Sequence, residues 1–176
     1  ARAQLVKAVR LDPLSSVIAG GLASVSLDEG RDDEARRQLS RALQLHGGDL
    51  LVGIGFLRLK DYETGAEVLR NARLPFIDGA ALDTVLAGLK DPAARPVAVA
   101  AALDRFDGPG SLFFLLELEA WEEAFQRAEA LATSRHALGH LRGTFGLWDP
   151  QHAAFRRDPR FARIADKMDI DAPPVE

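Results

Sequence analysis

Small and apolar residues recur along the chain in a three-point pattern. A small residue is followed four positions later by an apolar one, and three positions after that by a second small or apolar one. The pattern occurs at Ala1, Leu5 and Ala8, at Ala35, Leu39 and Ala42, at Gly65, Leu69 and Ala72, and more weakly at Ala124, Ala128 and Leu131. These offsets place all three residues on one helix face, where small side chains let a second helix approach closely. The pattern predicts closely packed helices.

A second set of small or apolar residues precedes each full copy by a constant interval. Ala23 lies 12 residues before Ala35, Gly53 lies 12 before Gly65, and Leu112 lies 12 before Ala124. Short polar segments interrupt each interval, at residues 28–32, at residues 60–61 and at residue 119. The repeating unit is therefore expected to be helix, tight turn, helix.

Between these copies and after them, capping signals predict further helices. Residues 78–90 and 92–105 are expected to form a degenerate pair, in which Asp91 caps the second helix and Pro92 lies in its first turn. Asp149-Pro150 and Asp158-Pro159 predict two short helices in the same way. We expect this tail to cover the last repeat with apolar side chains and to keep basic ones outside. The apolar set is Trp148, Phe155, Phe161, Ile164 and Met168, and the basic set is Arg156, Arg160, Arg163 and Lys167.

This combination resembles the tetratricopeptide repeat (TPR). The matching residues are Pro13, Leu22, Ala23, Gly30, Ala35, Leu39 and Ala42, then Val52, Gly53, Phe56, Tyr62, Gly65, Leu69 and Ala72. Ala8 and Ala42 are 34 residues apart, the usual period of that family, whereas Ala42 and Ala72 are 30 apart. The resemblance implies an all-α, right-handed solenoid of antiparallel helix pairs with a C-terminal helical cap. Repeats would occupy residues 1–134 (76–105 degenerate, the first repeat incomplete), the cap 135–170 and a frayed tail 171–176.

A second resemblance concerns the end of the chain. Leu147-Trp148-Asp149-Pro150 and residues 157–161, Arg-Asp-Pro-Arg-Phe, look like the closing segment of TPR regions in bacterial multidomain signalling proteins. Such proteins carry a winged-helix, cyclase or kinase-like module before the repeats. Because the chain starts inside an expected helix, we expect further residues upstream of Ala1.

Composition narrows the classes of function. The formal net charge of −4 argues against direct nucleic-acid binding, which usually needs a basic face. The chain has no cysteine, which excludes disulfides and thiolate sites. No apolar run is long enough to span a bilayer, so we expect no membrane insertion and a cytoplasmic location, with a periplasmic one left open.

No pattern of catalytic residues stands out. His136 and His140 are spaced to share a helix face, with His152 the nearest third ligand, but solvated or core-edge histidines explain them better. Gly53-Ile54-Gly55 lacks the preceding strand and third glycine of a nucleotide-binding loop, and no serine lies in a nucleophile elbow. We therefore expect no enzyme activity, no cofactor and no metal.

The resemblance to the TPR directs attention to a concave groove lined by the first helix of each pair. The expected groove residues are Val17, Ser24, Leu27 and Asp28, then Leu50, Ile54, Leu57 and Arg58, and later Phe113, Leu116 and Glu117. The Lys and Asn residues with which some relatives clamp a C-terminal carboxylate are absent. The alternative for each residue is simple packing against a neighbouring helix.

Two functional hypotheses follow from this groove. The first is a non-catalytic interaction or scaffold module, whose partner is a protein or peptide segment or another domain of the same polypeptide. The second is that the chain forms the C-terminal sensory or regulatory half of a bacterial multidomain signalling enzyme or transcription regulator. Neither the partner, the oligomeric state nor a small-molecule effector can be identified from the residues.

Overall fold

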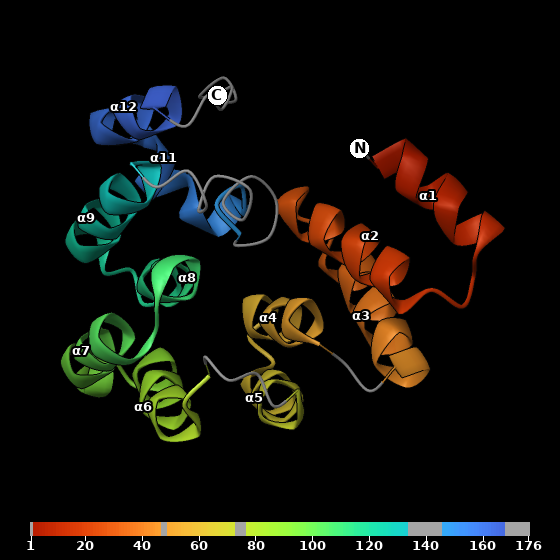
Figure 1. The fold of residues 1–176 in the computed structure, drawn as a ribbon, viewed down its shortest axis with the longest axis horizontal. Helices are drawn as coiled ribbons and strands as arrows, with labels where there is room; N and C mark the ends of the chain where they lie inside the picture. Colours follow the sequence, from red (N-terminus) through yellow and green to blue (C-terminus); the bar gives the residue numbers. More distant parts are fainter. Residues whose placement is uncertain (1, 47–48, 73–76, 134–145, 168–176) are drawn as a thin grey trace. The chain divides into compact units, whose positions relative to one another are not determined.

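A computed structural model describes residues 2–46, 49–72, 77–133 and 146–167. All regular secondary structure in these ranges is helical, which confirms the predicted all-α class (Figure 1). The chain divides into two compact units, residues 1–79 and 80–176, which are described separately.

The first unit contains α1 (Arg2–Leu11), α2 (Ser16–Asp28), α3 (Asp32–His46), α4 (Leu50–Arg58) and α5 (Tyr62–Asn71). Helix α2 packs along α3 and helix α4 along α5, while α2 and α3 also contact α4, and α1 contacts α2 (Figure 1). The side chains buried between these helices are small or aliphatic apart from one ring: Ala19, Ala23, Leu39, Ala42, Val52, Phe56 and Val68.

The second unit contains α6 (Gly79–Lys90), a 3₁₀ turn η1 (Pro92–Ala94), α7 (Arg95–Arg105), α8 (Gly108–Glu117) and α9 (Trp121–Ala132). After the undescribed residues 134–145 come a second 3₁₀ turn η2 (Pro150–His152), α11 (Ala153–Arg157) and α12 (Pro159–Lys167). Contacts join α7 to α8, α8 to α9, α9 to α12 and α11 to α12. The Asp91 carboxylate accepts a hydrogen bond from Ala93 N at 2.9 Å, as its predicted capping role requires.

The same tight turn joins the helices in three pairs. Gly30, Lys60 and Glu119 occupy equivalent places after α2, α4 and α8, and all three have a positive φ, of 68°, 59° and 56°. In each turn the next residue donates its N–H to the carbonyl five positions earlier, at 2.8, 3.0 and 2.9 Å. This left-handed closure of a helix favours glycine, yet only the first turn has one. The predicted order of helix, tight turn and helix is therefore found at all three places.

Small residues allow the paired helices to cross closely. A Cβ atom added to Gly65 would lie 2.6 Å from a methyl carbon of Leu57 and 3.0 Å from the carbonyl oxygen of Gly53. A Cβ atom on Gly53 would lie 2.6 Å from Leu69. In the preceding pair the same role falls to Ala23 and Ala35, both fully buried. The periodic small residues of the sequence thus lie where the two helix backbones approach each other.

The tail after residue 146 packs on α9 through aromatic side chains. Asp149 and Asp158 cap η2 and α12, accepting hydrogen bonds from Gln151 N at 3.2 Å and Arg160 N at 2.8 Å. The Phe155 ring stacks on that of Phe125 in α9, with ring centres 4.1 Å apart. Phe161 and Ile164 are buried as expected, Trp148 is half-buried, and Met168 lies outside the described residues.

One of the basic side chains expected on the outside of the tail is turned inward, and a second lies along the surface of α9. Arg156 is half-buried, and its Nη1 donates to the carbonyl oxygens of Leu147 and Asp149 at 2.7 Å each. Arg160 lies over the Phe125 ring and also binds Glu122 at 2.7 Å. Hydrogen bonds from Arg160 lower the pKa of Asp158 and raise the pKa of Arg160 in return. Arginine can make such contacts because its planar head donates in several directions.

The repeated left-handed turn can be tested by exchanging its residues. Replacing Lys60 by Gly should stabilise the first unit by about 0.5–1 kcal/mol, because a non-glycine residue with positive φ carries a steric cost of that order. The reverse change, Gly30→Ala, should destabilise it by about 1 kcal/mol. Urea denaturation measures both. A Lys60→Gly variant less stable than the parent, or a Gly30→Ala variant as stable as the parent, would show that the two turns are not equivalent.

The close helix crossing can be tested with two glycine substitutions in the same unit. Gly65→Ala should cost about 1–3 kcal/mol, because its new methyl group meets fully buried Leu57 and the Gly53 carbonyl. Gly20→Ala is the control, since a Cβ atom there meets nothing within 4 Å. It should stabilise α2 by about 0.5–1 kcal/mol through helix propensity. If both variants unfold at the same urea concentration as the parent, the crossing is looser than described.

Candidate functional site

Half of the eight residues expected in the groove of the first unit are buried, and only Val17 is exposed. On α2, Leu27 is buried, whereas Ser24 and Asp28 are half-buried. On α4, Ile54, Leu57 and Arg58 are buried, and Leu50 is half-buried. Leu57 is fully buried because it packs against Gly65 of α5. A side chain in that position stabilises the pair of helices and offers a partner no surface.

Two of these groove residues bind each other. Arg58 Nη2 lies 2.7 Å from Asp28 Oδ1, and the two side chains are 1% and 23% exposed. The ion pair joins the last turn of α2 to the last turn of α4. Because the guanidinium is withdrawn from water, loss of the carboxylate would leave a buried charge with a weaker partner set, a costly arrangement. The ion pair therefore gives a structural reason for an acidic residue at position 28 and a basic residue at position 58.

The expected groove residues of the second unit are also used for contacts within the chain. Phe113 and Leu116 are buried within α8 and its neighbours. The Glu117 side chain accepts hydrogen bonds from Gln151 Nε2, at 3.0 and 3.3 Å, and lies 3.5 Å from Nε2 of buried His152. The Nδ1 atom of His152 faces the Gly146 carbonyl at 2.8 Å, so Nδ1 donates there and Nε2 is directed at the carboxylate. Glu117 thus anchors the tail on α8.

Few of the side chains expected in the groove are therefore exposed enough to contact a partner. Leu57, Phe113 and Leu116 correspond to the alternative, packing against a neighbouring helix. Val17 differs from the rest, because it is 69% exposed.

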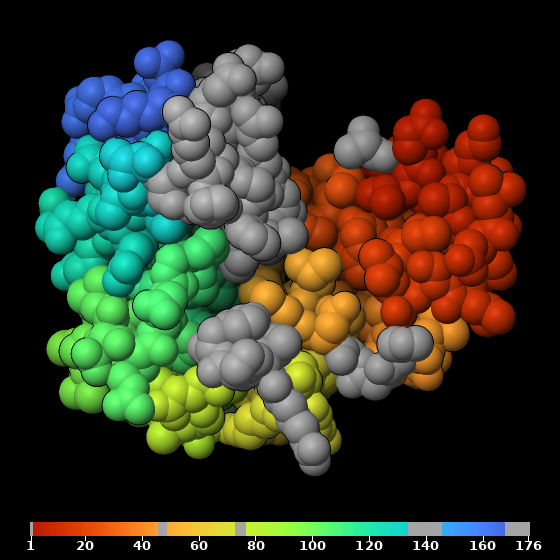
Figure 2. Space-filling model, in the orientation of Figure 1, coloured from red at the N-terminus to blue at the C-terminus, as the bar shows by residue number. Residues whose placement is uncertain are grey.

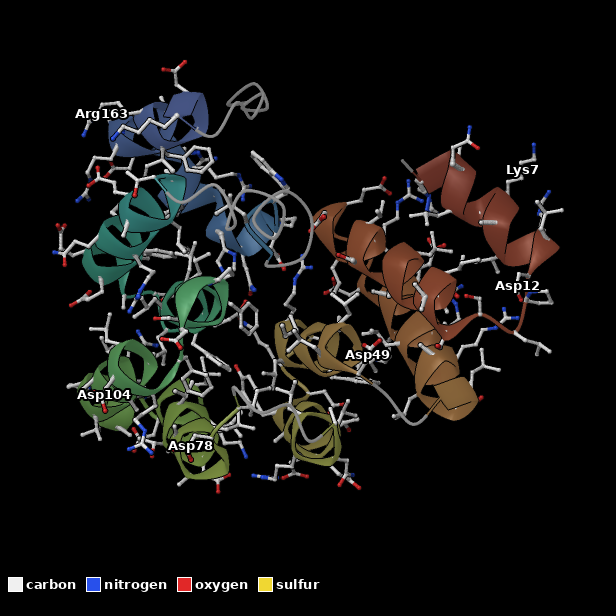
Figure 3. The ribbon with its side chains drawn as sticks, in the orientation of Figure 1. Lys7, Asp12, Asp49, Asp78, Asp104 and Arg163 are labelled. Atoms are coloured by element: carbon white, nitrogen blue, oxygen red, sulfur yellow. The ribbon has the colours of Figure 1, made fainter. Side chains whose placement is uncertain are left out.

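Val17 lines a pocket of about 340 Å³ at one end of the first unit. The connection between α1 and α2 and the first residues of α2 form one side: Asp12, Leu14, Ser15, Ser16 and Val17. The other side comes from Ala42 on α3 and from Asp49 and Val52 at the start of α4. Figure 3 labels Asp12 and Asp49, which lie at the end of α1 and the beginning of α4.

Leu14 and Val17 form the apolar rim of this pocket, and together with Leu11, which precedes Asp12 in the chain, they are the most exposed large apolar side chains of the described chain. Leu11, Leu14 and Val17 are 77%, 75% and 69% exposed. Figure 2 shows α1 and the segment after it, in red, at the surface of the first unit. In this segment the sequence pattern singles out only Pro13, as a residue matching the TPR, and Val17, as a groove residue. The signal that could have identified the rim is the spacing of three between Leu11, Leu14 and Val17 across an Asp-Pro break.

Local capping fixes the polar side chains of the pocket. Ser15 accepts from Ile18 N at 3.3 Å at the start of α2, and Asp49 accepts from Val52 N at 3.1 Å at the start of α4. Asp12 accepts from Leu14 N at 3.2 Å. Each carboxylate uses Oδ1 for this bond. Among the described residues, neither forms an ion pair, so both keep a net negative charge at the pocket.

Metal chemistry has no support in the described ranges. No group of three His, Asp or Glu side chains there could hold a metal ion. The candidate ligands His136 and His140 lie outside the described residues. None of the helices described is both long and apolar enough to cross a bilayer.

Comparison with known proteins does not place the chain in a family. It matched no family model, no curated protein and no solved structure. The resemblance to the TPR therefore rests on the residues themselves.

The contrast between buried and exposed positions can be tested by adding a charge to each. Leu57→Arg should destabilise the first unit by roughly 4 kcal/mol or more, because it places a charge among fully buried side chains. Val17→Arg should change stability by no more than about 0.5 kcal/mol. Thermal and urea denaturation compare the two. A stable Leu57→Arg variant would restore this position as groove surface.

Proposed function

We propose that the chain is a non-catalytic module that binds a protein or peptide segment, built as a TPR-like solenoid with a helical cap. The partner is a separate protein or another domain of the same polypeptide. The binding surface of the first unit is the pocket between the start of α2 and the start of α4, with the apolar rim formed by Leu14 and Val17.

The exposed apolar rim is the observation that carries this proposal. Large aliphatic side chains in water are unfavourable, and clusters of them beside a pocket are typical of interaction sites. A partner that covers Leu14 and Val17 would remove their apolar surface from water, which is favourable by about 25 cal/mol for each Å² buried. Binding energy in protein interfaces also concentrates on a few such side chains.

The packing beneath the pocket suits a binding role. Ala42 and Val52, at its base, are buried, and Val52 belongs with Ala42 to the core of the first unit. Side chains fixed in this way lose little conformational entropy when a partner binds.

Panning of a random dodecapeptide library against the purified chain tests the proposal. We expect peptides that bind the parent with micromolar affinity and lose at least about tenfold in affinity to a Leu14→Asp, Val17→Asp variant. The matched control is Val97→Asp. Val97 is an equally exposed valine on α7 in the second unit, 65% exposed against 69% for Val17.

Two results would contradict this function. One is that no peptide is enriched over an unrelated helical protein. The other is that enriched peptides bind the Leu14, Val17 variant as well as the parent. Equal melting temperatures of parent, variant and control would show that the loss of binding is not a loss of folding.

A further inference from the structure

We infer that the pocket beside Leu14 and Val17 accepts a lysine or arginine side chain of a protein partner, with the aliphatic stem on the apolar wall and the cationic head at the acidic part of the lining, formed by Asp12 and Asp49. This inference rests on the proposed function and names the chemistry of the segment that would bind.

The volume and the apolar wall suit one long side chain. The pocket measures about 340 Å³, and its apolar lining comes from Ala42, Val52, Leu14 and Val17. Small-molecule sites begin at about 300 Å³, so the space holds one or two side chains. Lysine and arginine combine a long aliphatic stem with a polar end, and they commonly lay the stem along apolar surface.

The polar lining favours a donor with positive charge. It consists of two carboxylates, Asp12 and Asp49, and two hydroxyls, Ser15 and Ser16, with no basic side chain. Each carboxylate accepts one backbone N–H through Oδ1, which leaves Oδ2 to accept from a ligand. A purely apolar ligand would strip water from these carboxylates without replacing its hydrogen bonds, which is unfavourable.

The helix ends at the pocket reduce the negative field but do not reverse it. The first turns of α2 and α4 each contribute about half a positive charge. Against this, Asp12 and Asp49 contribute two full negative charges. The cap side chains of Ser15 and Asp49 also occupy N–H groups that an anionic ligand would need. An acidic partner side chain is therefore disfavoured.

A basic group beside the pocket is Arg41, whose Nη2 donates to the Pro13 carbonyl. It has no hydrogen bond or ion pair to Asp12 or Asp49 within the described chain. Its charge still opposes a second cation nearby. Removing the charge of Arg41 should therefore strengthen binding of a basic side chain, whereas removing the charges of Asp12 and Asp49 should weaken it.

The probe is the strongest peptide from the dodecapeptide library, labelled for fluorescence anisotropy, together with versions in which each Lys or Arg is replaced in turn by norleucine. Norleucine keeps the stem and removes the charge. We expect one such replacement to weaken binding about 5- to 10-fold. We also expect the Kd of the parent peptide to rise between 0.05 and 0.5 M salt, since exposed charges are screened over that range.

Protein variants remove the charges while keeping the caps. Asn retains an oxygen that can accept from Val52 N or Leu14 N, so Asp12→Asn with Asp49→Asn changes charge with little change in capping. This double variant should bind the parent peptide about 5-fold more weakly and the norleucine peptide unchanged. Arg41→Gln should bind about 2-fold more tightly. Asp33→Asn, at an exposed position in the first turn of α3, is the charge control and should have no effect.

The outcomes separate this inference from the function on which it rests. Peptides that depend on Leu14 and Val17 but bind equally well to the Asp12, Asp49 double variant would overturn the cationic ligand and leave the function standing. Enriched peptides without Lys or Arg would do the same. Binding that ignores Leu14 and Val17 would overturn both.

Discussion

The close crossing of two helices in each pair is the constraint on which the rest of this structure depends. At Gly53 and Gly65 each backbone lies so near the other that even a methyl group would collide with its neighbours. Overlap of that kind costs stability, so the sequence must keep a small residue at each crossing. The residues four and seven positions after each small residue lie on the same helix face, so the helical period decides which side chains surround the crossing.

This crossing also decides which apolar side chains remain at the surface. Apolar side chains on α4 and α8 that could have formed a groove floor are used for packing, as Leu57 against Gly65 illustrates. Polar side chains also pair between neighbouring helices, as Asp28 of α2 does with Arg58 of α4. The ends of the helices do not take part in these crossings. The exposed apolar residues of the first unit accordingly lie beside the starts of α2 and α4, at Leu14 and Val17.

The sequence predicts the helices, their turns and several caps, because these depend on local chemistry. The caps at Asp91 and Asp149 formed as expected, and so did the turns at Lys60 and Glu119. It does not predict burial of the groove residues, because periodicity identifies a face of a helix and not the segment that covers it. The contacts of Glu117 with Gln151 and His152 join residues more than thirty positions apart, which no local pattern shows. Arg156 was misplaced for the same reason, since a basic residue in the sequence gives no sign that its partners lie inside.

The central claim is that partners bind at the end of the first unit and not along the predicted groove. The most direct measurement is a nuclear magnetic resonance titration of the isotope-labelled chain with the strongest selected peptide, recording amide shifts residue by residue. The account predicts the largest shifts at residues 12–17 and 49–52, around the pocket. Shifts centred on Ser24, Asp28 and Arg58, with residues 12–17 unchanged, would contradict it and return binding to the groove.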